Sequence, residues 1–417
     1  MPGLTMTEKI LARASGRDSV CAGDEVVARP DFVLAYVFSG FARFHKMIKE
    51  EFGLVQLDDA SRFKIFLDHN IPVTDQRLEA RVKEIRQWCE ASGVTVHADE
   101  GIGHVVAAEE GYATPGRFVV HFDGHISQLG TYGTLAIGVH TRIYEVFATG
   151  RISLRVPETV RIEFVGMRGP GVMARDVIQH LIRKFSAGGC NGKVIEFGGE
   201  GMRGFSSDEL RTLLGLAMFL GATSAIVEPH DSIPISAVLD SHEPEEVFSD
   251  SDAIYADKLL CDLSEVELTV AAPPSPANVV LLESVIGQTV NVGYIGSCVS
   301  GHITDLRVAA SVLRGRKVID DFILNIVPSS RRIMNQASKE GLLAQIIEAG
   351  GVISPPSCSF CYGAVGALRA GQTAISTGTL NIPGRMGSAQ ANIFLANAAV
   401  VAATAIEGRF AHPARYL

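Results

Sequence analysis

Short apolar runs alternate with segments of helical spacing along the chain, and this alternation constrains the fold more than any other feature. The runs have the length and composition of buried strands, at residues 63–67, 117–122, 159–164 and 194–197. The segments between them are typical of helices, at residues 79–92, 176–185 and 206–220. Strands that alternate with helices predict an α/β fold with largely parallel sheets. Polar residues just past the carboxyl ends of such strands line the ligand crevice.

The length of the chain predicts more than one domain. A chain of 417 residues buries enough core for two or three domains. Residues 229–280 are rich in turn-forming and acidic residues, which favours a boundary followed by a surface excursion. We therefore expect three α/β domains, over residues 1–152, 153–270 and 271–417.

Composition narrows the class of protein. The apolar fraction of 47% and the charged fraction of 20% are typical of a globular enzyme. The net charge of -9 argues against a general nucleic-acid binder, which needs a basic face. Seven dispersed cysteines are typical of reduced thiols or ligands and not of a disulfide framework. These features predict a protein without a nucleic-acid partner.

The two most informative terminal stretches predict helices and no membrane partner. Thr5 and Glu8 have the spacing of a capping box, which predicts a helix that ends near Gly16. The same stretch lacks the apolar core of a signal peptide, so we expect none there. Residues 393–406 are strongly apolar but too short to span a bilayer, so we expect a buried, alanine-rich helix. A cytoplasmic location follows as the expectation.

Three cysteines in the last third of the chain form a candidate metal site. Cys298 follows a Gly-Ser pair, and Cys358 and Cys361 form a C-x-x-C motif in a turn-rich stretch. Three thiolates can bind three irons of a [4Fe–4S] cluster and leave the fourth without a protein ligand. The same spacing fits a structural zinc site with His302 as fourth ligand, a redox pair or three unrelated thiols. The other four cysteines are expected to be ordinary thiols.

Polar residues follow two of the predicted strands. Asp68 and His69 follow the strand over 63–67, and Asp123 and His125 follow the strand over 117–122. A carboxylate beside a histidine tunes a proton donor through its charge and hydrogen bonding. The alternative interpretation is structural, with the aspartates capping turns and with His125, like His104, buried and satisfied.

Ordered segments over almost the whole chain match one known family. They lie at residues 6–12, 68–69, 101–104, 115–117, 148–150, 154–159, 194–197, 199–201, 296–298, 313–318, 340–342, 358–361 and 383–385. In this order the chain resembles the large subunit of the 3-isopropylmalate dehydratase and homoaconitase branch of the aconitase superfamily. The resemblance implies an aconitase-like α/β fold, with three α/β domains around a central cleft that holds an iron–sulfur cluster.

The resemblance also implies a chemistry and a set of site residues. It implies a hydro-lyase whose [4Fe–4S] cluster is bound by Cys298, Cys358 and Cys361 and whose open iron polarises the substrate hydroxyl. The residues that match the family's acid and pairing network are Asp68, His69, His104, Asp123 and His125. Glu196 matches the carboxylate near the cluster water, and Arg385 matches a substrate-binding arginine. In the family the base is a serine on a separate small subunit.

The chain departs from the family pattern at positions that face the substrate. Leu380 stands where the family has a substrate-binding arginine, and His302 and Ser300 replace an arginine and an asparagine. Gly124 and Ile126 replace two hydroxyl residues, and Phe38 and Phe41 add apolar surface in a changed segment over 35–41. Without a bidentate arginine, a substrate carboxylate is poorly paired. We expect a substrate with fewer carboxylates or an apolar group, such as a substituted malate or a maleate-like alkene, and a reaction that can stop at simple hydration or dehydration.

Two hypotheses of different class remain open from the sequence. The first is a [4Fe–4S]-dependent hydro-lyase acting on a 2-hydroxy acid with a separate small subunit. The second is a non-catalytic, cluster-binding or zinc-binding scaffold that kept the fold and lost the substrate arginines. Residues 328–331 superficially resemble the serine–arginine signature of the family's small subunit, but they match a large-subunit segment and we do not assign them the base.

Overall fold

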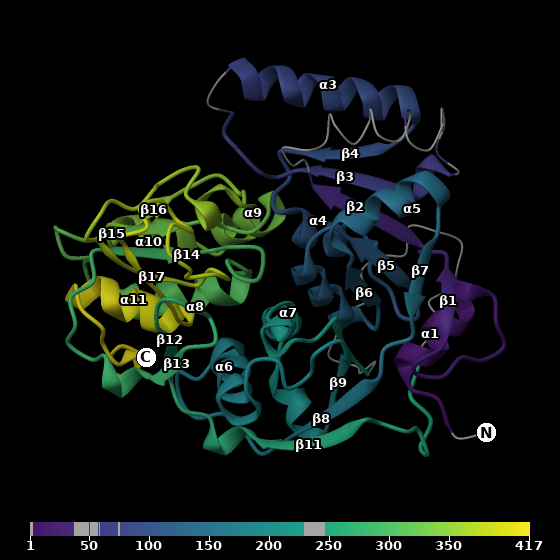
Figure 1. Cartoon of the computed structure of the whole chain (residues 1–417). Helices are drawn as coiled ribbons and strands as arrows, with labels where there is room; N and C mark the ends of the chain where they lie inside the picture. Colours follow the sequence, from purple (N-terminus) through teal and green to yellow (C-terminus); the bar gives the residue numbers. More distant parts are fainter. Residues whose placement is uncertain (1–2, 37–49, 51–56, 58, 74–75, 229–246) are drawn as a thin grey trace.

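Three sheets dominate the architecture. The computed structural model of the chain describes residues 3–36, 50, 57, 59–73, 76–228 and 247–417. A five-stranded, a four-stranded and a seven-stranded sheet lie in three lobes, with the seven-stranded sheet on the left of Figure 1 and the other two on the right. Phe38 and Phe41 lie outside the described residues.

The five-stranded sheet is entirely parallel in the order β4-β3-β2-β5-β6. Its strands are β2 (Phe32–Tyr36), β3 (Phe63–Leu67), β4 (Thr95–Ala98), β5 (Phe118–His121) and β6 (Leu135–Gly138). Its helices are α3 (Gln76–Ser92), α4 (Gly103–Glu109), α5 (Ile143–Thr149) and the 3-10 helix η2 (Gly124–Tyr132). The chain proceeds outward from β2 to β4 and then returns to β5 on the other side. The carboxyl ends of β2 and β5 therefore form a topological switch point, where ligands bind in open parallel sheets.

The N-terminal helix α1 (Met6–Ser15) has the predicted caps. Thr5 and Glu8 form the capping box, and Gly16 ends the helix in the left-handed conformation. Beside the helix, β1 (Glu25–Ala28) pairs antiparallel with β7 (Ile152–Arg155) in a separate ribbon. The Leu4 amide donates to Asp250 at 2.8 Å, which ties the start of the chain to the four-stranded sheet.

The four-stranded sheet is parallel in the order β10-β9-β8-β11. Its strands are β8 (Thr159–Val165), β9 (Val194–Gly198), β10 (Ser224–Val227) and β11 (Asp257–Asp262), and its helices are α6 (Ala174–Phe185) and α7 (Ser207–Gly215). The strand β11 corrects the prediction of a surface excursion over 229–280. The strand buries Cys261 against the core and pairs with β8, so it completes the sheet as an edge strand. Residues 229–246 lie outside the described part of the chain.

The seven-stranded sheet has the order β13-β12-β18-β17-β14-β15-β16. Its five parallel strands are β14 (Val292–Ile295), β15 (Ile323–Ile326), β16 (Val352–Ile353), β17 (Thr373–Ser376) and β18 (Asn392–Leu395). The antiparallel strands are β12 (Thr269–Ala271) and β13 (Val279–Leu281), and the helices are α8 (Ile303–Leu313), α9 (Arg331–Lys339), α10 (Leu342–Glu348) and α11 (Ala398–Glu407). Its switch point lies between β14 and β17.

The prediction of one helix over residues 393–406 is wrong at its start. Residues up to Leu395 belong to β18, and the helix α11 begins only after Asn397. The Asn397 side chain accepts a hydrogen bond from the Val400 amide at 2.9 Å and is the N-cap of α11. A buried strand and a buried helix are both apolar, so only the capping asparagine marks the boundary between them.

The lobes are joined through the four-stranded sheet. Its helix α7 packs against η2 of the first lobe, and α6 packs against β12 of the third. One continuous apolar cluster includes buried residues of both the four-stranded and the seven-stranded sheets. The domain boundaries at residues 152 and 270 stay a prediction. Among the described helices, none is both long enough and apolar enough to cross a bilayer.

Candidate active site

Loops that follow strands of the first and third sheets meet. Asp68 follows β3, and the η8 turn (Ser359–Tyr362) lies in the third lobe. The Cys358 amide donates to the Asp68 carbonyl at 2.9 Å, and the Asn70 amide donates to the Tyr362 hydroxyl at 3.1 Å. Polar residues from the carboxyl ends of two parallel sheets therefore face one another, as the sequence rule for ligand crevices predicts.

The three candidate ligand cysteines come together and are buried. Cys298, Cys358 and Cys361 are 4%, 7% and 8% exposed. The Cys358 thiol is in hydrogen-bond contact with both of the others, and this contact and burial raise its pKa. The hydrogen bond from Cys358, together with the Arg385 guanidinium, lowers the pKa of Cys361 despite burial. Three adjacent sulfurs, one of which has a lowered pKa that favours its thiolate form, are a donor set that suits iron.

The backbone that carries Cys298 is fixed by a close approach. Gly296 follows β14 with a φ of 128°, and a Cβ there would lie 2.0 Å from the Val327 carbonyl oxygen. Only glycine fits this position. From the first lobe, the Gln128 amide donates to the Cys298 carbonyl at 2.8 Å.

Among the described residues, no set of three or more His, Cys, Asp or Glu side chains is arranged to hold a single metal ion.

Asp68 and His69 form a tight pair beside the cysteines. Asp68 Oδ1 lies 2.6 Å from His69 Nδ1, and Asp68 Oδ2 accepts from the Gly103 amide at 2.8 Å. Burial opposes the charged forms, but the interaction of the two side chains lowers the pKa of Asp68 and raises the pKa of His69. Tyr36 stacks on the imidazole at 4.4 Å between ring centroids. Asp68 thus caps the start of α4 and also favours the protonated form of His69.

His104 lies in the same crevice with unused hydrogen-bonding capacity. Its side chain is 3% exposed, and neither ring nitrogen has a hydrogen-bond partner among the described residues. His104 Nε2 lies 3.8 Å from Asp123 Oδ1. Burial lowers the pKa of His104, although Asp123 and Asp68 oppose this shift. An imidazole with both nitrogens open can bind the polar group of a ligand.

Asp123 and His125 occupy the turn into η2. Asp123 Oδ1 accepts from the His125 amide at 2.7 Å, and His125 Nδ1 lies 2.7 Å from the Gly215 carbonyl oxygen. Although burial opposes the charge, the neighbouring His125 and His104 lower the pKa of Asp123. The backbone contact of His125 and the turn contact of Asp123 therefore fit the structural interpretation of these residues. The His121 ring lies 4.7 Å from the His104 ring between centroids, and His121 Nδ1 accepts from the Asp123 amide at 2.8 Å.

Glu196 lies within β9 and is bound by a different set of groups. Its carboxylate is fully buried and accepts from Arg161 at 2.7 Å, Tyr255 at 2.6 Å and Ser249 at 2.7 Å. Arg161 also pairs with Glu228 at 2.8 Å. The described hydrogen bonds do not link Glu196 to the other candidate residues. Its catalytic role stays a prediction.

Arg385 points at the cysteines. Its Nη2 atom lies 3.1 Å from the Cys361 sulfur, so it pairs with a thiol and not with an internal carboxylate. Thr379 Oγ1 lies 3.7 Å from the same sulfur. Leu380, where the resemblance places an arginine in the family, is half-buried in the segment after β17.

Two further sequence candidates have structural contacts. Ser330 donates to Glu109 at 2.6 Å, and Ser329 donates to the Gly301 carbonyl at 3.2 Å. His302 Nδ1 lies 3.2 Å from the Ser329 hydroxyl, and Arg211 and Asp208 act on its charge. None of these described neighbours of His302 is a cysteine, which leaves the zinc hypothesis without its fourth ligand.

Comparisons with known proteins agree with this geometry. The family model of the aconitase family (aconitate hydratase) matches residues 43–289 and 283–408. A protein of Methanopyrus kandleri named 3-isopropylmalate dehydratase large subunit 1 is 37% identical, and the match covers 100% of both chains. Another, of Rubrobacter xylanophilus, named 3-isopropylmalate dehydratase large subunit 2, is 37% identical over 98% of this chain and 97% of its own.

A third relative and a solved structure complete the comparison. The 3-isopropylmalate dehydratase large subunit of Aquifex aeolicus is 36% identical over 99% of this chain and 97% of its own. The crystal structure of Thermococcus kodakaraensis aconitase X in its holo-form shares the fold, with a TM-score of 0.53, 13% identity and coverage of 85% of this chain and 84% of that one. The chain belongs to the aconitase family, whose relatives named here are hydro-lyases.

Proposed function

We propose that the chain is the large subunit of a [4Fe–4S]-dependent hydro-lyase that acts on a 2-hydroxy acid with a separate small subunit. One observation carries the proposal. Three buried sulfurs, at Cys298, Cys358 and Cys361, converge beside His69, whose pKa is raised by Asp68, and His104, whose ring nitrogens have no partner among the described residues. Such a set combines metal ligands with groups that can move a proton and bind a polar ligand.

The residues present fit the cluster. Thiolates are the ligands of iron–sulfur clusters, and the Arg385 guanidinium favours the thiolate form of Cys361. When bound, the cluster supplies an iron with open positions, which acts as a Lewis acid on a hydroxyl or carboxylate. Cys298, Cys358 and Cys361 would hold it.

The proton that the leaving oxygen needs is best supplied by His69. Asp68 raises the pKa of His69, which favours the protonated form that can donate, and the His69 ring lies at the carboxyl end of the first sheet. His104 would bind the substrate or its leaving water through its unpartnered nitrogens. Asp123 stays ionised beside it and orients the site. Glu196 is retained in the proposal as a candidate near the leaving water.

The base is assigned to a partner. The relatives are named large subunits, which implies a small subunit in those proteins. In this chain the Ser329 and Ser330 hydroxyls already donate to Gly301 and Glu109. This supports a serine base on a separate swivelling subunit.

The substrate is inferred from the lost arginine. Leu380 replaces a group that grips a carboxylate, and Arg385 alone remains near the sulfurs. A substrate with an apolar group on one side fits this change, such as a substituted malate or the alkene made by its dehydration. The reaction is then a hydration or dehydration and need not complete an isomerisation.

Anaerobic purification, with and without a co-expressed small subunit, tests the proposal. We expect broad visible absorption with about four irons and four sulfides per chain. Cys298→Ala should abolish both, whereas Cys190→Ala, at a buried thiol outside the site, should not. Alkyl malates are then screened by the absorbance of the conjugated alkene. Iron without turnover in the two-subunit complex favours the scaffold hypothesis, and a colourless protein after reconstitution contradicts the cluster.

A further inference from the structure

Arg175 stands in an unfavourable place. It is the second residue of the twelve-residue helix α6 and is only 4% exposed. The N-terminus of a helix carries a partial positive charge, so acidic residues are favoured there and a cation is not. Burial also opposes its charge and lowers the pKa of Arg175 to about 10. Residues that violate a local rule of this kind are expected at functional positions.

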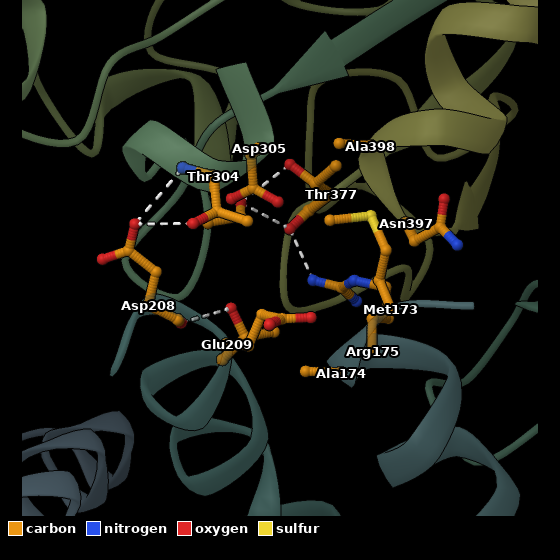
Figure 2. Close-up of a pocket in the computed structure, with 12 residues that line it drawn as sticks. Met173, Ala174, Arg175, Asp208, Glu209, Thr304, Asp305, Thr377, Asn397 and Ala398 are labelled. Atoms are coloured by element: carbon orange, nitrogen blue, oxygen red, sulfur yellow. Dashed lines mark hydrogen bonds between the residues drawn. The ribbon is translucent and has the colours of Figure 1, made fainter. Parts of the chain in front are cut away.

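The guanidinium of Arg175 reaches across to the third lobe. Its Nη2 atom donates to the Thr377 carbonyl at 2.5 Å, and Figure 2 shows the side chain extending from α6 towards Thr377. Thr377 follows β17, on one side of the switch point of the seven-stranded sheet. The hydrogen bond therefore joins the second lobe to the edge of the candidate site.

Thr377 in turn holds the loop that carries Cys298. Its carbonyl also accepts from the Ser300 hydroxyl at 2.9 Å and from the Ser297 hydroxyl at 3.3 Å. Its own hydroxyl accepts from the Gly296 amide at 2.8 Å. These three loop residues flank Cys298 on both sides, so the position of Thr377 sets the position of the cysteine.

The network surrounds a small cavity and includes a second side chain that holds the loop. A cavity of about 10 Å³, room for about one water, lies between Arg175, Asp305 and Thr377. Asp305 accepts from the Gly301 amide at 2.8 Å, which holds the far end of the same loop. Hydrogen bonds to Thr377 and to Asp305 thus hold the loop at both ends.

We propose that Arg175 is a positioning residue for Cys298, which it holds in place from the neighbouring lobe through the Thr377 carbonyl. The role as stated rests on the proposed function, because it matters most if Cys298 binds iron. Arg175 supplies a hydrogen bond from a buried cation to the carbonyl that supports the loop. Removing it loosens one of the three sulfurs and leaves the other two in place.

Site-resolved alkylation of the cofactor-free full chain tests this role without iron. Iodoacetamide labelling is followed by mass spectrometry at each cysteine under anaerobic conditions. Arg175→Met should raise the labelling rate of Cys298 about tenfold, the factor expected for loss of one charge-assisted hydrogen bond. Cys358 and Cys361 should change less than threefold. Arg175→Lys keeps the charge and should restore most of the protection.

A matched control separates positioning from the general loss of a buried arginine. Arg62 is 6% exposed and donates to the Gly150 carbonyl at 2.9 Å in the first lobe. Arg62→Met should leave Cys298 labelling unchanged. Ser300→Ala loosens the same loop without removing a charge, so it serves if Arg175→Met does not fold.

The outcomes are distinct from those of the proposed function. If Cys298 is labelled at the wild-type rate in Arg175→Met, or in Ser300→Ala where that variant is needed, the positioning role is wrong. An equal rise in Arg62→Met contradicts it as well. In reconstituted protein, Arg175→Met should also lose iron to a chelator about tenfold faster than wild type. Failure of the wild type to bind iron overturns the cluster and leaves the labelling result standing.

Discussion

Two buried polar side chains, His104 and Glu196, differ in what surrounds them. Both are matched to catalytic positions by the family resemblance, and both are almost fully buried. Among the described residues, His104 has no hydrogen-bond partner at either ring nitrogen, whereas Glu196 accepts from three donors. An unpartnered buried polar group destabilises the fold, and a partnered one does not. The comparison teaches that two residues matched by the same motif evidence can differ in open hydrogen-bonding capacity, and this difference predicts opposite responses to mutation.

The largest expected effect is at His104, the residue with open hydrogen-bonding capacity. His104→Leu should lower kcat about a thousandfold, because it removes a group that contacts the substrate or its water. The free energy of unfolding should stay the same or rise, because the variant removes two unpartnered buried nitrogens. Steady-state kinetics with the small subunit and urea unfolding measure the two quantities. A kcat within tenfold of wild type would remove His104 from the site.

Glu196, whose carboxylate is hydrogen-bonded, should respond in the opposite way, with a loss of stability. Glu196→Gln leaves the buried guanidinium of Arg161 with one close carboxylate, Glu228, and should lower the free energy of unfolding by about 3 kcal/mol. Glu163→Gln is the control, since Glu163 lies 3.6 Å from Arg161 but is half-exposed and should cost less than about 1 kcal/mol. Urea unfolding measures both. A large loss of kcat without loss of stability would place Glu196 among the reacting groups.

Much of the fold follows from local sequence. The strand over residues 63–67 is observed as predicted because a short apolar run ends at the polar Asp68 and His69. The error over 393–406 arose because strand and helix are equally apolar there. In the site, the rule of polar residues past strand ends finds Asp68, His69 and Asp123. It cannot find Arg175 or Gln128, since their contacts join residues about 200 and 170 positions apart.

The lowered pKa values of two buried histidines, His121 and His302, predict an effect of pH on stability. Burial, with His104 for His121 and Arg211 for His302, lowers the pKa of each to about 3. The ordinary pKa of histidine in the unfolded chain is about 6.5, so the unfolded state binds more protons between these values. The contribution of the two histidines to the free energy of unfolding therefore rises with pH in this window, whereas Asp305, whose pKa burial raises to about 7, contributes a change of the opposite sign. The histidine contribution should fall by about 2 kcal/mol per histidine from about pH 6.5 to about pH 5.

His302→Gln tests this effect and also tests the criterion of open capacity. Urea unfolding of the variant at several pH values should give a free energy of unfolding that depends less steeply on pH. The reduction should equal the contribution of one histidine. His302 Nε2 is buried without a partner, yet its described contacts lie outside the candidate site. We expect kcat to stay within threefold of wild type. A loss as large as that of His104→Leu would extend the site to His302, and an unchanged slope would contradict its neutral state.

The smallest expected effect adds capacity instead of removing it. Leu380→Arg restores a cation in the half-buried segment after β17, where a second carboxylate of a substrate would be gripped. We expect a KM about tenfold lower for a malate with an additional carboxylate, or about 1.4 kcal/mol, and no gain for an alkyl malate. Ile382→Arg is the control, since Ile382 is 44% exposed and its added charge is screened by water. Equal gains in both variants would mean that charge anywhere near the crevice suffices, and that Leu380 does not determine specificity.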